Sequence, residues 1–461
     1  MIPLSLADIA KITGAVPGLV TEPGALIGSV VIDSRKAGPG ALFAAVPGER
    51  VDGHDFAGAA VAAGAVAVLA TRPVGVPALV TADVPAALAT LARAVTEALP
   101  HLTIAGITGS VGKTTTKDLA AQLVERLGPT VAPQGSYNNE IGHPLTVLRV
   151  TEQTRYLVLE LSARGAGHIA QLCQIAPPTL GVVLCVGHAH TGEFGGIEAV
   201  ARAKRELPAA LPPTGVALLN CDDPRVLAMA DRTAARVVTF GRGAHATVRA
   251  ADVQVDGQGR AEFTLVTPDG SAPVRLRLVG EHNVTNALAA AALARELGLP
   301  VAAAAEGLSA ADPRSRWRME VTERADGVTV INDAYNANPE GMAAAIETLA
   351  VMARGRRAFA VLGPMNELGS ESPQRHEEVG RVAARAGVAG LIVVGEDAVP
   401  MLSGARAERF WRGELLGVPD ASSAVAALGN LLAPGDVVLV KASRTVGLER
   451  VALALTGEAA Q

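Results

Sequence analysis

The sequence predicts an α/β protein of three domains, the central one built on a mostly parallel sheet. Its 461 residues exceed the usual length of one domain and suggest about three. Short hydrophobic runs alternate with helical patterns along the chain, which is typical of parallel strands joined by helices. Hydrophobic residues make up 49% of the chain and aromatic ones only 3%. We therefore expect ample cores of Ala, Val and Leu side chains.

The first predicted domain, residues 1–98, is a small α/β unit. Its expected strands are the short runs at Ser29–Ile32, Leu42–Ala45, Ala65–Ala70 and Ala78–Val80. Helical patterns cover 55–63 and 84–98.

The central predicted domain, residues 99–311, alternates strands and helices more regularly. Its expected strands are 102–107, 156–160, 180–185 and 216–220. Its expected helices are 114–127, 168–175, 197–207, 225–230, 283–297 and 301–308. This alternation predicts a mostly parallel sheet. Residues 237–279 are rich in Val and Thr with polar alternation, so we expect an antiparallel flap there.

The third predicted domain, residues 312–461, follows a plausible linker at Asp312-Pro313. Its expected strands are 328–332, 357–362, 390–394 and 436–440. Its expected helices are 339–351, 373–387, 421–432 and 445–455. We expect a Rossmann-like α/β arrangement here.

Charge and cysteine content argue against several kinds of protein. The net charge is −5 and no long basic run occurs, so nucleic acid is a poor candidate partner. The three cysteines are scattered and lack metal-site spacing, which fits a reducing compartment. No stretch reaches the roughly 18 apolar residues of a membrane span. We expect a cytoplasmic monomer that does not insert into membranes.

A phosphate-binding loop at residues 106–117 is the most informative motif. A hydrophobic strand leads into it and a helix leads out, so its backbone N–H groups and the helix N-terminus would attract an anion. Lys113 would reach the β- and γ-phosphates, and the Thr114 hydroxyl would bind Mg²⁺. Ile107 stands where the usual pattern has glycine. The alternative is a glycine-rich turn with a chance Lys-Thr, but the order of strand, Gly-Lys-Thr and helix favours a nucleoside triphosphate.

Several polar residues follow predicted strands, where ligands gather in open α/β sheets. Glu160 ends one such strand and could hold Mg²⁺, or it could be a solvated strand end. His190 follows another, as a metal ligand or as a structural histidine. Lysine is scarce in the chain, which draws attention to Lys204, although pairing with a nearby glutamate is an alternative. The Asn- and Asp-rich segment 332–339 suits either a turn or ligand contacts.

Together these motifs resemble the Mur ligases, ATP-dependent amide-bond-forming enzymes of peptidoglycan synthesis, over essentially the whole chain. The family loop is Thr-Gly-Ser/Thr-x-Gly-Lys-Thr-Thr/Ser, which residues 108–115 match. Further family blocks correspond to residues 137–142, 159–162, 189–190, 203–207, 219–224 and 280–287. Ser162 departs from a usual glycine, and Gly187-His188 departs from the more usual residues before Ala-His.

Three regions narrow the resemblance to the family member that acts last. Residues 33–35, 39–43 and 48–56 look like the uridine-nucleotide domain of the two last-acting ligases, whereas the Asn138-Asn139 loop and residues 333–339 look like the last one. The resemblance implies ATP-dependent ligation of D-alanyl-D-alanine to UDP-N-acetylmuramoyl-tripeptide through an acyl phosphate. It also implies a uridine-nucleotide domain at 1–98, a P-loop ATPase-like domain at 99–311, and a dipeptide-binding domain at 312–461 that closes over the site.

The resemblance also implies roles for individual residues. The expected ATP-binding residues are Gly109, Ser110, Val111, Gly112, Lys113, Thr114, Thr115, Asn283, Asn286 and Arg318. The expected Mg²⁺ ligands are Thr114, Glu160, His190 and a carbamylated Lys204. The expected substrate-binding residues are Ser34, Arg35, Asn138, Asn139, Tyr335, Asn336 and Asn338. The expected catalytic residues are Lys113, Lys204 and Asp333.

Three alternatives stay open on the sequence. The first is the preceding family member, the tripeptide synthetase, which typically has Asp-Tyr-Ala-His where this chain has residues 333–339. The second is a P-loop switch that binds ATP without ligation. The third is a kinase that leaves its phosphate on the product.

Overall fold

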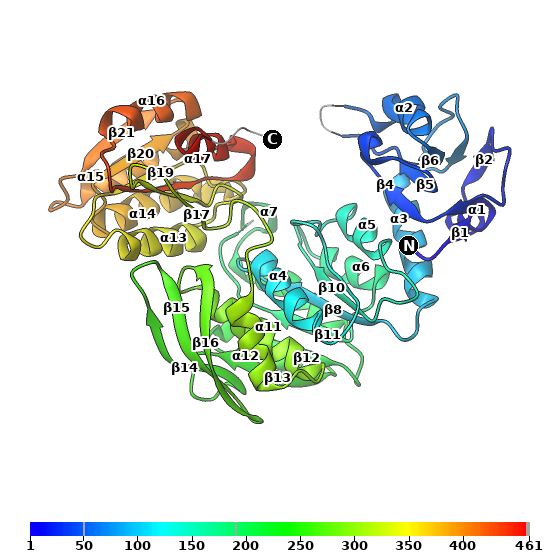
Figure 1. Ribbon diagram of the computed structural model, residues 1–461, viewed down its shortest axis with the longest axis horizontal. Coiled ribbons are helices and arrows are strands. Elements are labelled where there is room, and N and C mark those ends of the chain that lie inside the picture. The colour runs from blue at the N-terminus through cyan, green and yellow to red at the C-terminus, as the bar shows by residue number, and fades with distance from the viewer. Residues whose placement is uncertain (49–50, 190, 458–461) are drawn as a thin grey trace.

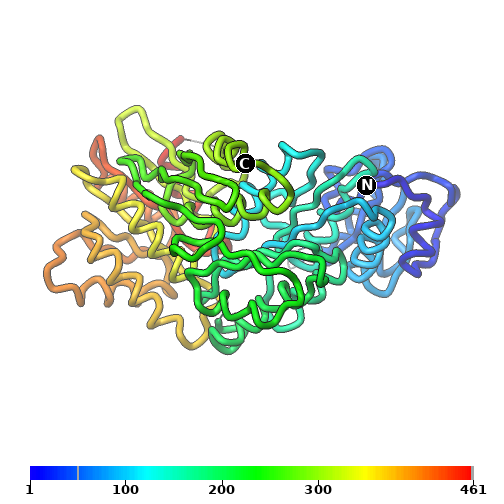
Figure 2. The backbone as a smooth tube through the Cα atoms, turned by 90° about the horizontal axis from the view of Figure 1, so that it is seen from below, coloured from blue at the N-terminus to red at the C-terminus, as the bar shows by residue number. Residues whose placement is uncertain are grey.

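The computed structural model describes residues 1–48, 51–189 and 191–457 and arranges them as three α/β units (Figure 1). We call residues 1–98 the first unit, 99–311 the central unit, and the rest the third unit. The first and third units lie at opposite ends of the molecule, with the central unit between them (Figure 2). None of the helices in the described part of the chain has the length and apolar character needed to cross a membrane.

The first unit is built on a small sheet whose described strands run in the order β2-β7-β6-β5-β4. All neighbours are parallel except β2 and β7, and β1 and β3 form a separate antiparallel pair. The strands are β1 (Leu4–Ser5), β2 (Val16–Gly18), β3 (Leu26–Ile27), β4 (Ser29–Val31), β5 (Ala41–Ala44), β6 (Ala65–Ala70) and β7 (Ala78–Val80). The helices are α1 (Leu6–Thr13), α2 (Ala57–Ala62) and α3 (Val84–Glu97), with 3-10 turns η1 (Ser34–Lys36) and η2 (Gly53–Phe56). The sequence analysis had missed α1, although Ser5 caps it and Gly14, at φ 67°, ends it.

Helix α3 joins the first unit to the central one. Asp83 caps its N-terminus, and its large apolar residues Val84, Leu88, Leu91 and Val95 are fully buried. Leu88 and Leu91 belong to one hydrophobic cluster that contains Leu69 of the first sheet and Leu172 of the central unit. The first two units therefore share a core.

The central unit is built on a sheet whose described strands run in the order β16-β15-β14-β13-β12-β11-β8-β10-β9. The strands are β8 (Thr103–Thr108), β9 (Thr130–Val131), β10 (Tyr156–Glu160), β11 (Leu180–Val183), β12 (Val216–Asn220), β13 (Arg236–Gly241), β14 (Val248–Val255), β15 (Arg260–Thr267) and β16 (Gly270–Val279). The helices are α4 (Lys113–Val124), α5 (Gly142–Val147), α6 (His168–Ile175), α7 (Thr191–Phe194), α8 (Ile197–Lys204), α9 (Glu206–Ala209), α10 (Pro224–Leu227), α11 (Asn283–Glu296) and α12 (Val301–Ala310), with η3 (Ala228–Arg232).

The expected antiparallel flap at 237–279 is only partly right. Strand β13 pairs parallel to β12 and to β14, and only the pairs β14–β15 and β15–β16 are antiparallel. These strands extend the central sheet instead of forming a separate flap. Alternation of polar and apolar residues indicates that one face of a strand is exposed to solvent, but it does not determine whether the strand pairs parallel or antiparallel to its neighbours.

The register of the central strands brings the predicted site to one edge of the sheet. Strand β8 lies between β10 and β11, with Ile107 opposite Glu160 and Thr108 opposite Val183. The phosphate loop, Glu160 and the loop that follows β11 thus leave the sheet at its carboxyl edge, where ligands bind in open α/β sheets.

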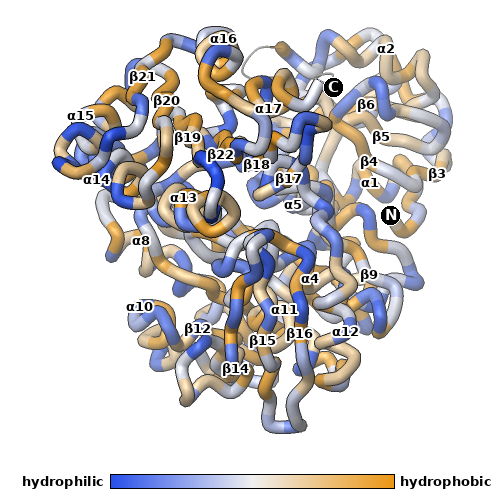
Figure 3. Tube along the Cα trace, turned by 60° about the vertical axis from the view of Figure 1, so that its left-hand side comes forward, coloured by the Kyte–Doolittle hydropathy of each residue, from blue (hydrophilic) through white to orange (hydrophobic). Residues whose placement is uncertain are grey.

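The third unit has its own sheet, whose described strands run in the order β17-β18-β22-β19-β20-β21. The strands are β17 (Glu320–Glu323), β18 (Thr329–Asn332), β19 (Ala358–Leu362), β20 (Gly390–Val394), β21 (Glu414–Val418) and β22 (Val437–Lys441). The helices are α13 (Pro339–Met352), α14 (Ser372–Arg385), α15 (Pro400–Ala407), α16 (Ala421–Leu431) and α17 (Glu449–Thr456), with η4 (Gly369–Glu371), η5 (Glu396–Ala398) and η6 (Arg444–Val446). Hydrophobic residues lie along β19 and β20 (Figure 3), and the strands of the third-unit sheet contribute residues to two hydrophobic core clusters. The short β17, β21 and α15 had not been expected.

Candidate functional site

The phosphate loop leaves β8 after Thr108 and enters α4 at Lys113. Gly112, at φ 82°, is the residue before the helix, and a Cβ there would lie 2.2 Å from the Asn286 side-chain oxygen. Both the left-handed backbone and the lack of space require glycine. Ser110 is held by the loop that follows β11, because its hydroxyl accepts from the Gly187 N–H at 2.8 Å. The loop is thus shaped before any ligand arrives.

Lys113 folds back over this loop. Its ammonium group donates to the Gly109 carbonyl at 2.7 Å and to the Ser110 carbonyl at 3.4 Å. Burial lowers the pKa of Lys113, while the nearby Glu160 carboxylate acts in the opposite direction. Among the described residues its hydrogen-bond acceptors are carbonyls of the loop, so it can turn to phosphate oxygens at little cost.

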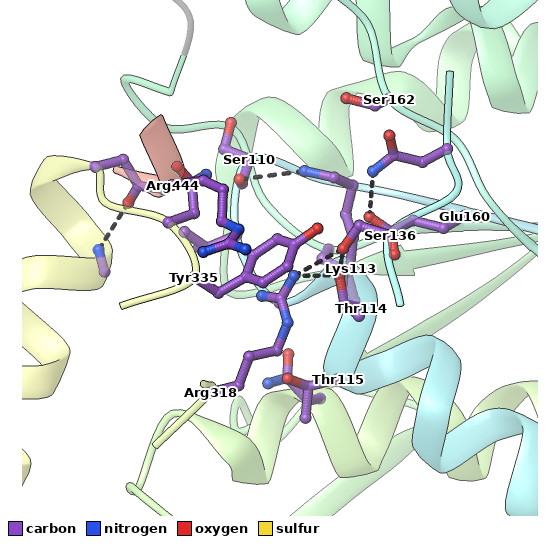
Figure 4. Close-up of a pocket in the computed structure, with 18 of the residues that line it drawn as sticks. Ser110, Lys113, Thr114, Thr115, Ser136, Glu160, Ser162, Arg318, Tyr335 and Arg444 are labelled. Carbon is purple, nitrogen blue, oxygen red and sulfur yellow. Dashed lines mark hydrogen bonds between the residues drawn. The ribbon is translucent and has the colours of Figure 1, made fainter. Parts of the chain in front are cut away.

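Thr114 meets an arginine from the third unit. Arg318 donates to the Thr114 hydroxyl at 2.7 Å and to the Ser136 hydroxyl at 2.9 Å, and its guanidinium lies 4.2 Å from the centre of the Tyr335 ring (Figure 4). The Arg318 Nε atom is buried and has no hydrogen-bond partner among residues 1–48, 51–189 and 191–457. A buried donor of this kind fits an acceptor atom on a bound ligand.

Glu160 is a buried carboxylate at the end of β10, with an exposed fraction of 1%. The Asn138 amide donates to its Oε1 atom at 2.6 Å. Its Oε2 atom is buried and lacks a partner within the described residues. Carboxylate and hydroxyl oxygens are the ligands that Mg²⁺ prefers, so Glu160 and Thr114 fit a magnesium ion. No group of three His, Cys, Asp or Glu side chains gathers around a metal position in the described part, so phosphate and water would supply the remaining ligands.

Lys204 ends α8 and is buried, with an exposed fraction of 4%. Burial, followed by repulsion from Lys113, lowers its pKa to about 7. A large fraction of this amine is therefore neutral near pH 7. His190, the other expected metal ligand, lies outside the described residues.

The segment that follows β18 is fixed by a lysine of the third unit. Lys441 donates to the Asp333 carboxylate at 2.5 Å and to the Asn336 carbonyl at 2.8 Å. Asn338 caps α13 by accepting from the Gly341 N–H at 2.8 Å. The segment is thus an ordered turn, as one interpretation expected, whereas its ligand contacts stay a prediction. Sequence reasoning had missed Lys441, although the scarcity of lysine was a usable signal.

Asn283 and Asn286 support the phosphate loop from behind. The Asn286 amide donates to the Asn283 side-chain oxygen at 2.8 Å, and the Thr116 hydroxyl donates to Asn286 at 3.2 Å. Both side chains are buried. They link the start of α11 to the start of α4.

One cavity of about 1470 Å³ collects most of these residues and is lined by all three units. The expected residues that line it are Ser110, Val111, Gly112, Lys113, Thr114, Thr115, Asn138, Asn139, Glu160, Asn283, Asn286, Arg318, Asp333, Tyr335, Asn336 and Asn338. Gly109 and Lys204 lie behind this lining, next to Lys113. The first unit contributes the start of α3, including Asp83 and Pro85.

Ser34 and Arg35 lie elsewhere, in η1, and do not line the cavity. The Arg35 side chain is 88% exposed, and two of its nitrogens donate to the Asp33 carboxylate, each at 2.9 Å. This pairing matches a structural turn. It leaves the guanidinium accessible to a ligand of the first unit.

The sequence analysis also missed cavity residues that only the folded chain brings together. Ser136 binds Arg318 (Figure 4). The Arg444 guanidinium lies 4.2 Å from the centre of the Trp317 ring. Glu340 of α13 accepts from the His188 backbone N–H at 2.9 Å and lies 2.7 Å from its Nδ1 atom, which joins the third unit to the central one. Contacts between residues so far apart in the sequence cannot be predicted from a local sequence pattern.

The fold and the cavity define a three-unit nucleotide-binding enzyme whose phosphate loop faces residues of another unit. Comparison with protein families matches the Mur ligase family, catalytic domain, to residues 26–109, the Mur ligase middle domain to 107–294, and the Mur ligase, glutamate ligase domain to 317–444. The chain belongs to the Mur ligase family.

Individual relatives agree with this assignment. The UDP-N-acetylmuramoyl-tripeptide–D-alanyl-D-alanine ligase of Mycobacterium tuberculosis is 50% identical, covering 99% of this chain and 98% of the relative. The enzyme of the same name from Escherichia coli is 36% identical over 97% and 98%. Among solved structures, MurF from Acinetobacter baumannii matches with a TM-score of 0.87 at 32% identity, covering 99% of both chains. MurF ligase from Thermotoga maritima in complex with ADP matches with a TM-score of 0.79 at 30% identity, covering 93% and 97%.

Proposed function

We propose that this chain joins D-alanyl-D-alanine to UDP-N-acetylmuramoyl-tripeptide in peptidoglycan synthesis, at the expense of ATP, which becomes ADP and phosphate. The observation that supports this most is the single cavity in which the phosphate loop of the central unit faces the Asp333–Asn338 segment of the third unit. A ligase needs this arrangement, because ATP and two further substrates must meet. The related enzymes described above carry this activity in their names.

We assign one task to each unit. Residues 1–98 bind the uridine nucleotide, residues 99–311 bind ATP, and residues 312–461 bind the dipeptide and close the site. The lining of the cavity supports this division, since each unit contributes residues to it. ATP and a nucleotide-linked peptide are cytoplasmic metabolites, so we place the reaction in the cytoplasm.

In the first step, the carboxylate of the tripeptide attacks the γ-phosphorus of ATP, and ADP leaves. Two anions must approach each other, so the barrier is lowered by fixed positive charge. Lys113, which lies over the phosphate loop, and Arg318, which binds the Thr114 hydroxyl, supply that charge. The product of this step is an acyl phosphate.

In the second step, the amine of D-alanyl-D-alanine attacks the acyl carbon, loses a proton, and phosphate leaves. The acyl phosphate must be kept from water until then. Tyr335, Asn336 and Asn338 are placed to cover it from the third unit. The Lys441 contacts keep this segment ordered.

A magnesium ion fits beside the phosphate loop, held by Thr114 and Glu160. It would neutralise phosphate charge in the transition state. We further propose that His190 and a carbamylated Lys204 hold a second ion. The low pKa of Lys204 supports this, because a neutral amine is the form that reacts with carbon dioxide. Carbamylation would also remove the charge repulsion between Lys204 and Lys113.

An assay of phosphate release tests the activity and separates its rivals. We expect phosphate only when ATP, UDP-N-acetylmuramoyl-tripeptide and D-alanyl-D-alanine are all present. Release of phosphate with UDP-N-acetylmuramoyl-dipeptide and a free diamino acid would instead identify the tripeptide synthetase. Slow release from ATP alone would indicate a switch, and a phosphorylated product without free phosphate would indicate a kinase.

A further inference from the structure

The linker between the central and third units is bound to the phosphate-loop helix. Asp118, Gln122 and Glu125 lie four and then three residues apart, so they share one face of α4 and its C-cap. Each of them binds a residue of the segment 312–315. This segment lies along the helix whose N-terminus holds the phosphates.

The contacts along this segment are specific. The Asp312 backbone N–H donates to the Gln122 side-chain oxygen at 3.1 Å, and the Gln122 amide donates back to the Asp312 carbonyl at 3.1 Å. Arg314 forms a two-pronged ion pair with Glu125, with both distances 2.6 Å. The Ser315 hydroxyl donates to Asp118 Oδ2 at 2.6 Å.

The Ser315 contact is the most protected of these. Asp118 is 7% exposed, and its other oxygen pairs with the ammonium of Lys117, which is 1% exposed and also donates to the Pro133 carbonyl at 2.9 Å. Arg314 and Glu125 are both more than 40% exposed, so their pairing is weakened by solvent. A hydrogen bond to a buried, already paired carboxylate is stronger and better fixed. The hydrogen bond of Ser315 is therefore the best-fixed contact between the linker and α4.

The chain passes to the third unit directly after Ser315. The Trp317 carbonyl accepts from the Tyr335 N–H at 3.2 Å, and the Met319 N–H donates to Asp333 at 3.0 Å. Trp317 and Met319, at φ 59° and 52°, both occupy the left-handed region that non-glycine residues rarely adopt. Two such residues flank Arg318, at the place where the backbone changes from one unit to the other.

Arg318 is thus tethered close to the phosphates. Arg318 stands only three positions after Ser315, a span of at most about 11 Å even when the chain is fully extended. Any rotation of the third unit about this point leaves Arg318 near Thr114. Without the Ser315 contact, the attachment to α4 that comes next before Arg318 would be the solvent-exposed ion pair of Arg314 with Glu125. The stretch of chain free to move with Arg318 would then be one residue longer.

We propose that Ser315, held by Asp118, is a positioning residue for ATP, which acts by keeping Arg318 at Thr114. The proposal rests on the ATP-binding role given above, and it assigns no contact between Ser315 and any substrate. It places the pivot of the third unit between Ser315 and Trp317. It also gives a purpose to the buried Lys117–Asp118 pair, which no step of the reaction uses.

The test measures binding of Mg²⁺ and β,γ-imido-ATP to the full chain by calorimetry. We expect Ser315→Ala to weaken binding by at least about fivefold, because it removes a hydrogen bond to a charged group. Ser315→Cys, a weak donor of similar volume, should behave like alanine, whereas Ser315→Thr keeps the hydroxyl and should bind within twofold of the wild type. The matched control is Arg126→Ala, which breaks an ion pair between the end of α4 and Glu306 but leaves the linker untouched.

A double-mutant cycle shows whether Ser315 acts through Arg318. In an Arg318→Ala background, Ser315→Ala should cause no further loss of binding. A loss that persists there, or single Ser315 variants that bind like the wild type, would overturn the proposal. Thermal unfolding of each variant separates local from global effects. A wild-type chain that fails to bind the nucleotide would contradict the proposed function itself.

Discussion

At the scale of single residues, the ammonium group of Lys113 already lies over the phosphate loop, where it donates to the Gly109 carbonyl. We predict that Lys113→Ala abolishes ligation and leaves binding of the uridine nucleotide nearly intact. The loss of one fixed cation from a closed site should raise the barrier by at least about 3 kcal/mol. Single-turnover rates test this, with the exposed Lys11→Ala as control. A variant with half the wild-type rate would contradict the role.

Lys204 offers a second test at the residue scale. We predict that Lys204→Ala loses activity and that a short-chain carboxylic acid restores part of it, by taking the place of the carbamate. Intact mass at neutral pH, in the presence of bicarbonate, should show the added carbon dioxide on the wild type only. Full activity of the variant without any acid would end the idea of a carbamylated ligand.

His143 makes the stability of the protein depend on pH. It is fully buried at the second position of α5, and burial lowers its pKa from 6.5 to about 4. The unfolded chain binds a proton below pH 6.5 and the folded chain does not until about pH 4, so stability falls as the pH falls through this window. The shift corresponds to about 3 kcal/mol.

The measurement for His143 is the free energy of unfolding at pH 7.5 and pH 4.5. We expect His143→Leu to lose less stability than the wild type between these values. The exposed His101→Gln should lose as much as the wild type does. Equal slopes for the His143 variant and the wild type would show that the buried imidazole is not the group responsible.

At the scale of elements, we propose that η1 binds the uridine nucleotide. Asp33 and Arg35 close this turn on themselves, and it lies outside the cavity. We predict that Ser34→Ala and Arg35→Ala raise the Michaelis constant for the uridine-nucleotide peptide and leave that for ATP unchanged. Arg93→Ala, which breaks an exposed ion pair on α3, is the control. A rise for ATP alone would remove η1 from the substrate site.

The elements show what a sequence can and cannot predict. Buried strands such as β8, β10 and β20 were found because a run of apolar residues marks them. Edge strand β17, with the sequence Glu-Val-Thr-Glu, has a neighbour on one side only and carries no such signal. Helix α5 contains a proline and is buried all round, so it lacks the amphipathic pattern on which helix prediction depends.

The residues of the site also divide into those that a local sequence pattern marks and those that only the folded chain brings together. Motifs that bind through their own backbone, such as the phosphate loop, are local and were predicted with their residues. The contact between His188 and Glu340 spans 152 positions and depends on how two units meet. The same is true of Arg318 and Ser136, since neither has a local partner. The family resemblance supplied Arg318, and nothing in the sequence supplied Ser136.

At the scale of the whole molecule, we predict that the third unit closes over the central one when ligands bind. The two units already touch through Arg318 and Thr114, through His188 and Glu340, and through the Gly192 N–H and the Glu367 carbonyl. The cavity between them still has a volume of about 1470 Å³. Domains with separate cores usually move relative to each other.

Solution scattering tests closure. The radius of gyration should fall when a non-hydrolysable ATP analogue and the nucleotide peptide are added together, and should change less with either one alone. An unchanged radius under saturating ligands, in an enzyme shown to be active, would mean that the arrangement seen here is already the working one.

The core shared through α3 constrains how the chain can fold during synthesis. The first 98 residues leave the ribosome first, but the apolar side of α3 packs in a cluster that extends to Ala235. Until that later stretch has emerged, α3 can pack against α1 of its own unit, but the surface that meets α5 and α6 stays uncovered. The N-terminal unit must therefore wait, partly exposed, for the central sheet, whereas the core clusters of the third unit, apart from Val279, consist of residues that this unit itself supplies. A nascent chain stalled between these two points would be a natural client of chaperones.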